Sequence, residues 1–157
     1  LSEYQTNVVY RGDNAIERLS RDLDVILLDR RMPMVSGNEV LAAIEEAGID
    51  CRVVMVAATA TDSDVIDLRV DDYLTKPVTR AQLRGVVERL LTLDEYNDRI
   101  RELTSKKLKR NVLEVENMRS PVVESAEFEQ LQAEIAGLES EVNALADKLD
   151  HTESEYD

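Results

Sequence analysis

The chain has 157 residues, the usual size of one domain or of two small ones. Its 33 acidic and 19 basic residues give a net charge of −14, which argues against a surface that binds nucleic acid. No apolar run approaches the roughly 18 residues that a membrane helix needs, so we expect a cytoplasmic protein without membrane contact. The single cysteine, Cys51, fits a reducing compartment, and the acidic excess favours a source with a high-salt cytoplasm, where screening relieves the repulsion.

Between residues 6 and 87, short apolar runs alternate with amphipathic stretches, which is the pattern of strands and helices in βα order. The runs predict strands over residues 6–10, 25–29, 52–58 and 72–75. The other stretches predict helices over residues 13–20, 37–46, 62–69 and 80–91. The runs at 25–28 and 53–56 are apolar on both faces, so they belong inside a parallel sheet covered on both sides. The sequence therefore predicts a doubly wound, flavodoxin-like α/β fold.

After Leu93 this alternation stops, and two long helices are predicted. Residues 94–117 continue the preceding helix until the Ser120-Pro121 pair, because the residue before a proline is pushed away from helical angles. A second helix is predicted over residues 125–149. Its apolar residues follow a coiled-coil spacing of three and four: Phe128, Leu131, Ile135, Leu138, Val142, Leu145 and Leu149. We therefore expect an α/β domain over residues 1–93 and a helical domain over residues 94–157.

The apolar seam of the last helix can face a second copy of the chain or the helix before it. In a parallel homodimer, Glu134 would lie across from Glu139 of the partner subunit, which is unfavourable at low salt. In an antiparallel hairpin, a basic run would lie beside Glu134, Glu139 and Glu141 instead; this run is Lys106, Lys107, Lys109 and Arg110. Charge favours the hairpin, and a homodimer or a protein partner on these helices stays open. Nucleic acid on the basic run is disfavoured by the acidic helix beside it.

Two charged residues mark the carboxyl ends of predicted strands. Asp29 ends the run at 25–29, and Lys76 follows the last strand and precedes Pro77. The carboxyl ends of parallel strands meet at one edge of a sheet, which is where ligands bind in such folds. A carboxylate there can attack a phosphoryl group if a metal and a cation share the developing charge. The proline permits a cis bond, which would aim the ammonium group toward the crevice.

Two ordered motifs resemble the phosphorylation site of response regulator receiver domains: LLDRRMP at residues 27–33 with Gly37 after it, and YLTKP at residues 73–77. The resemblance implies that Asp29 is the phosphoacceptor, that Lys76 contacts the phosphate and that the backbone carbonyl of Arg31 ligates the metal. It also implies that Tyr73 turns inward on activation. By the same resemblance Mg²⁺ is the cofactor, and a phosphohistidine on a sensor histidine kinase is the donor.

Two departures from the family pattern matter. The family's first strand carries an acidic pair that holds the metal, and this strand would precede Leu1. We therefore expect a truncated receiver, without its first strand and most of its first helix, that binds Mg²⁺ weakly or not at all. Ala57 stands at the phosphate-binding position where the family has Ser or Thr, and Thr59 is about 6.6 Å further along at a rise of about 3.3 Å per residue. Thr59 can substitute if the loop bends, but a weakened switch is the favoured interpretation.

The adjacent acids Asp71 and Asp72 point to opposite faces of a strand, so we expect a solvated loop end there and no shared ion.

Residues 94–149 are similar to the helical part of haloarchaeal regulators that end in a HalX domain. A hydrolase with Asp29 as nucleophile is disfavoured, because enzymes of the haloacid dehalogenase type need a second acid where Arg31 stands. We therefore expect a signalling protein and no enzyme. The alternative is a degenerate receiver that is never phosphorylated and acts as an interaction module.

Overall fold

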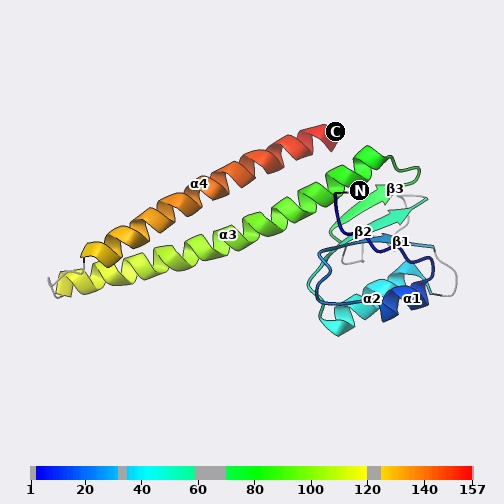
Figure 1. Cartoon of the computed structure of the whole chain (residues 1–157), viewed down its shortest axis with the longest axis horizontal. Helices are drawn as coiled ribbons and strands as arrows, with labels where there is room; N and C mark the ends of the chain where they lie inside the picture. Colours follow the sequence, from blue (N-terminus) through cyan, green and yellow to red (C-terminus); the bar gives the residue numbers. More distant parts are fainter. Residues whose placement is uncertain (1–2, 32–34, 59–69, 120–124, 157) are drawn as a thin grey trace. The chain divides into compact units, whose positions relative to one another are not determined.

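The computed structural model describes residues 3–31, 35–58, 70–119 and 125–156. The chain forms two compact units, residues 1–91 and residues 92–157. The first unit holds a parallel sheet of three strands in the order β1 (Val25–Asp29), β2 (Arg52–Ala57) and β3 (Asp72–Thr75). It also contains α1 (Gly12–Glu17), α2 (Gly37–Ala47) and the beginning of α3 (Arg80–Arg119) (Figure 1).

Alternate side chains of each strand enter two different apolar clusters, one on each face of the sheet. Met55 of β2 lies in the cluster with Val40, Leu41 and Ile44 of α2. Val54 of β2 lies in the other cluster, with Val86 and Leu90 of α3. Successive side chains of a strand point to opposite faces, so a sheet that is covered on both sides needs strands that are apolar throughout. The predicted doubly wound fold is confirmed.

The expected strand at residues 6–10 is wrong. In the described part of the chain this segment pairs with no strand, and Val8 and Tyr10 are 64% and 83% exposed. A β-branched and aromatic run favours a strand only where it can pack on a half-buried surface, and only Val9 is even partly buried here. Residues 6–10 have residue types that favour a strand, but the segment has no face that is buried against the rest of the described structure.

The helix predictions fared better. Helix α1 is shorter than expected, because the Arg18 N–H is shared between the carbonyls of Asn14 and Ala15 and the chain then leaves the helix. Helix α2 matches, and the expected helix at 62–69 lies outside the described residues. Residues 80–119 form one continuous helix, α3, as predicted. The predicted break at Ser120-Pro121 also lies outside the described residues.

The second unit is an antiparallel hairpin of α3 and α4 (Ser125–Tyr156), in which the two helices run side by side (Figure 1). Leu103 of α3 packs against one face of α4, and this face consists of Leu131, Ile135, Leu138 and Val142. These α4 residues are at most 9% exposed, so the middle of the predicted heptad seam is buried within the chain, and its end residues Phe128, Leu145 and Leu149 are partly buried. The hairpin, which charge favoured over a parallel dimer along this seam, is the observed arrangement.

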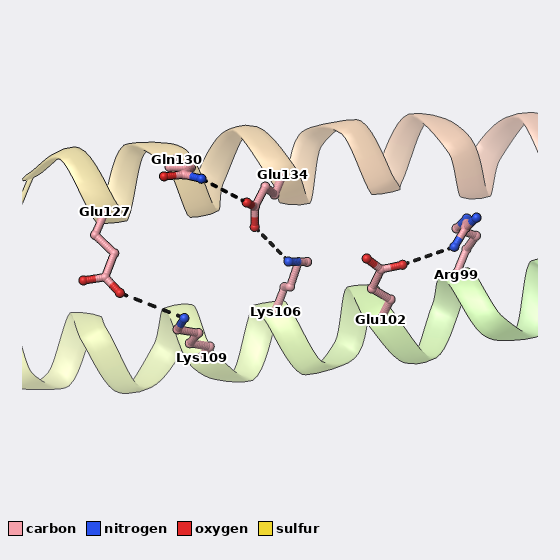
Figure 2. A network of polar contacts seen from close by, with 7 residues as sticks. All are labelled: Arg99, Glu102, Lys106, Lys109, Glu127, Gln130 and Glu134. Atoms are coloured by element: carbon pink, nitrogen blue, oxygen red, sulfur yellow. Dashed lines mark hydrogen bonds and ion pairs between the residues drawn. The ribbon is translucent and has the colours of Figure 1, made fainter.

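Ion pairs cross between the two helices of the hairpin (Figure 2). Lys106 Nζ lies 2.8 Å from Glu134 Oε2, and Lys107 Nζ lies 3.3 Å from Glu139 Oε1. The hydrogen bond between Lys106 and Glu134 raises the pKa of Lys106 and lowers the pKa of Glu134. Exposed pairs of this kind contribute little, so the buried seam supplies most of the stability.

None of the helices in the described part of the chain combines the length and the apolar character that crossing a membrane requires.

The hairpin's dependence on its seam can be measured by urea denaturation followed by circular dichroism. Ile135 is 3% exposed, so Ile135→Ala should lower the free energy of unfolding by about 2–5 kcal/mol. Lys106→Ala, which removes an exposed ion pair, should change it far less. Equal losses in the two variants would contradict the assignment of stability to the seam.

Candidate functional site

The structure brings Asp29 and Lys76 together at the carboxyl edge of the sheet. Asp29 ends β1 opposite Val56 of β2, and Ala57 of β2 lies opposite Thr75 of β3. The Lys76 N–H then donates to the Ala57 carbonyl at 2.8 Å, which carries the ladder one residue past β3. Residues 47 positions apart in the sequence therefore meet because three parallel strands end in register.

Both oxygens of the Asp29 carboxylate have partners. Lys76 Nζ donates to Oδ2 at 2.8 Å, and the Arg31 N–H donates to Oδ1 at 3.1 Å. The side chains of Asp29 and Lys76 are 40% and 45% exposed, so the pair lies at the surface where another protein can reach it. The Lys76–Pro77 peptide bond is cis, as the sequence analysis allowed. The arrangement offers a nucleophilic oxygen with a cation already beside it.

Gly37 supports the turn that follows Asp29, and its contribution goes beyond its place in the sequence motif. Its N–H donates to the Arg30 carbonyl at 3.0 Å. A Cβ at this position would lie 2.6 Å from the Asp29 carbonyl oxygen and 2.9 Å from Arg30 Cα. Only glycine permits this close approach of α2 to the end of β1.

Ser36, which had not been predicted as important, caps the start of α2 beside the site. Its hydroxyl accepts a hydrogen bond from the Glu39 N–H at 3.3 Å. A serine followed three residues later by a glutamate is a recognised signal for the start of a helix. This Ser-Gly-Asn-Glu pattern accounts for the start of α2 at Gly37, where the sequence had predicted it.

The other predicted site residues lie as follows. Ala57 is buried, with 5% exposure, at the end of β2 and beside the Lys76 backbone. Tyr73 is partly buried and packs on the cluster beneath α2. Arg31 is exposed, and its N–H contacts the Asp29 carboxylate. Thr59, the predicted substitute for a Ser or Thr at position 57, lies outside the described residues.

Asp71 and Asp72 have separate partners, and neither is simply solvated as expected. Asp71 Oδ2 accepts from the Val53 N–H at 2.7 Å, and Asp72 Oδ2 lies 3.2 Å from a guanidinium nitrogen of Arg89. Pairing of β2 with β3 starts at Val54, so the N–H of Val53 needs another acceptor, and Asp71 supplies it. Asp71 therefore helps to fix the start of the β2–β3 ladder, and Asp72 pairs with α3.

The residues present fit Mg²⁺ only in part. Within the described ranges, no three His, Cys, Asp or Glu side chains gather in a way that could hold a metal ion. Asp29 is a suitable hard oxygen ligand, and Mg²⁺ commonly binds through one or two carboxylates, with water and phosphate completing its shell. Among the described residues, Asp29 offers a carboxylate at this edge, and an incoming phosphate would add further oxygen ligands.

Comparison with known proteins identifies relatives of both units. A family model for the response regulator receiver domain matches residues 1–88, and a model for the HalX domain matches residues 92–156. A Haloferax volcanii protein named "Putative transcriptional regulator" is 36% identical over 155 residues, which are 95% of this chain and 27% of that protein. These matches confirm the resemblance that the motifs predicted, haloarchaeal relatives included.

Other relatives match the first unit alone. The transcriptional regulatory protein CutR of Streptomyces coelicolor is 40% identical over 88 residues, which are 54% of this chain and 41% of that protein. The signal receiver domain of a "putative Luxo repressor protein" from Vibrio parahaemolyticus superposes with a TM-score of 0.50 at 29% identity, over 57% of this chain and 72% of that one. The chain spans less than half the length of either curated relative.

The role of Gly37 in the turn after Asp29 can be tested with a matched pair of glycine variants. Gly37→Ala should lower the free energy of unfolding by about 1–3 kcal/mol, because the methyl group overlaps backbone atoms. Gly137→Ala in α4, where a Cβ meets no atom within 4 Å, should be neutral or raise it by up to about 1 kcal/mol. Thermal unfolding of both variants measures the difference, and a tolerated Gly37→Ala would contradict the proposed close approach.

Proposed function

Because the chain belongs to the response regulator receiver family, we propose that Asp29 accepts a phosphoryl group from a phosphohistidine of a sensor histidine kinase. The observation that carries this proposal is the 2.8 Å contact between Lys76 Nζ and Asp29 Oδ2 at an accessible edge of the sheet. A carboxylate oxygen of Asp29 attacks the phosphorus atom while the bond from phosphorus to the histidine nitrogen breaks. The departing imidazole keeps the electron pair and takes up a proton from water.

Lys76 would stabilise the charge on the transferred group. Its ammonium now contacts the carboxylate oxygen, and a phosphoryl group on Asp29 brings new anionic oxygens within its reach. An ion pair as exposed as this one is worth about 0–1 kcal/mol, so releasing the carboxylate costs little. The lysine can therefore follow the negative charge from the free carboxylate to the phosphate.

Mg²⁺ would be held by the Asp29 carboxylate and, by family resemblance, the Arg31 carbonyl. When bound, the ion neutralises charge on the transferred phosphoryl oxygens. With one carboxylate at the site among the described residues, we expect Mg²⁺ to bind weakly, so that phosphorylation needs high Mg²⁺ concentrations.

The helical unit is the proposed output, and α3 connects it to the receiver. Helix α3 supplies Val86 and Leu90 to the apolar cluster around Val54 on one face of the sheet, and it supplies Leu103 to the core of the hairpin. In this proposal, phosphorylation biases the surface near Tyr73 and the helices carry the change to a protein partner. A net charge of −14 disfavours direct contact with nucleic acid, although several relatives are named as transcriptional regulators.

A second candidate function is a receiver that is never phosphorylated and serves as a protein-interaction module. Ala57 favours it, because a methyl group cannot donate a hydrogen bond to a phosphate. Phosphoryl transfer to Asp29 separates the two candidates.

The proposal is tested by incubating the chain with a small acyl phosphate and following its intact mass. Labelling should be slow, should increase with Mg²⁺ without saturating, and should vanish in Asp29→Asn. Lys76→Gln should slow labelling on the order of a hundredfold, the effect of losing one positioned charge-stabilising group. Lys148→Gln, an exposed lysine on α4, is the matched control and should leave the rate unchanged.

Absence of labelling at any Mg²⁺ concentration would favour the interaction module. Labelling that persists in Asp29→Asn would refute the assignment of the phosphoacceptor. Rapid labelling that saturates at low Mg²⁺ would contradict the weak metal site.

A further inference from the structure

Helix α3 carries an apolar stripe that nothing in the described chain covers. Leu108, Val112, Val115 and Met118 are 60%, 57%, 52% and 89% exposed, which makes them most of the exposed large apolar residues in the described structure. Their spacings of four, three and three residues place them along one side of the helix. A contiguous apolar patch of this kind on a strongly charged protein marks an interaction surface.

Most of the stripe lies on the side of α3 that faces away from α4. Leu103, which is 7% exposed, packs on α4. At about 100° per residue, Leu108, Val112 and Val115 lie about 140°, 180° and 120° around the helix from Leu103, whereas Met118, near the end of α3, lies about 60° from it. The stripe is therefore separate from the seam of the hairpin and stays available after the hairpin has formed.

The charges beside the stripe make it complementary to itself. Lys109 and Glu116 are both exposed, and they stand seven residues apart on the same edge of the stripe. When two copies of α3 pack antiparallel with Val112 opposite Val115 of the partner subunit, Lys109 of each copy lies about 3 Å along the axis from Glu116 of the other, an offset that a lysine side chain can span. In such a two-fold pair, the edge of one helix lies along the same edge of the other copy. The contact between Lys109 and Glu116 therefore occurs twice.

Parallel packing lacks this complementarity. It would place Lys109 near Thr104 of the partner subunit and Glu116 near Asn111 of the partner subunit, and both of these residues are uncharged. Within the chain, Lys109 Nζ lies 4.0 Å from a Glu127 oxygen, at the outer limit of an ion pair, and its side chain is 61% exposed (Figure 2). This long contact leaves the lysine able to reach a second copy.

We propose that a second copy of this chain covers the stripe by antiparallel packing of α3 against α3. The residues from Leu108 to Met118 extend along about 15 Å of helix at 1.5 Å per residue. A surface this short buries less than the standard protein interface of about 1,600 Å², so the dimer is weak and depends on concentration. The proposal does not depend on phosphorylation of Asp29, and either can fail without the other.

The first test is sedimentation velocity of the whole chain over a wide range of concentrations. The average mass should rise toward that of a dimer as concentration increases. Val112→Glu, which places a charge at the centre of the stripe, should weaken association about tenfold or more, without unfolding, because Val112 is already 57% exposed. Ala133→Glu on the exposed side of α4 is the matched control and should associate like the parent chain.

A charge-swap experiment tests the antiparallel register. Lys109→Glu and Glu116→Lys should each weaken self-association at low ionic strength, because like charges then face each other twice. An equimolar mixture of the two variants should recover association, since each copy then offers the charge that the other lacks. The double variant K109E/E116K should recover it too.

A chain that stays monomeric at every concentration would overturn the proposal, as would a Val112→Glu variant that dimerises like the parent. Single charge variants that weaken association without recovery in the mixture would overturn the antiparallel register.

Discussion

The contact between Lys76 and Asp29 depends on one constraint, which is that three parallel strands end at the same edge of one sheet. The register of β1 with β2 and of β2 with β3 places the ends of all three strands side by side. Backbone hydrogen bonds then continue past the strands, from the Arg30 N–H to Val56 and from the Lys76 N–H to Ala57. The side-chain pair at 2.8 Å is the consequence of this ladder, and the proposed phosphoryl chemistry follows from the pair.

The same constraint explains why the sequence predicted this site. A strand that is buried on both faces must be apolar along its whole length, so the first charged residue after such a run marks the edge of the sheet. Asp29 is that residue for β1, Lys76 directly follows the edge strand β3, and the parallel order brings both to one edge. The heptad of α4 was equally informative, because Leu131, Ile135 and Leu138 could be buried only against another helix. The basic run on α3 indicated that this helix is α3, packed antiparallel to α4.

Other features depended on tertiary contacts that residue patterns do not contain. Residues 6–10 have the composition of a strand, but a strand also needs a paired neighbour and a buried face, and Val8 and Tyr10 face solvent. The structural role of Asp71 was missed because its partner, the Val53 N–H, is 18 residues away. The contact of Gly37 with the Asp29 backbone required knowing how closely α2 approaches β1. Ser36 is the exception, because its capping pattern is local and can be recognised in the sequence.

The central claim is that the carboxylate of Asp29 takes up the phosphoryl group. Reduction with borohydride after exposure to a phosphorylated sensor kinase tests it most directly, because an aspartyl phosphate is converted into homoserine and peptide mapping reports the position. The account predicts homoserine at position 29 and at no other aspartate. Homoserine at another aspartate, or an unmodified Asp29 in a chain that has taken up phosphate, would contradict it.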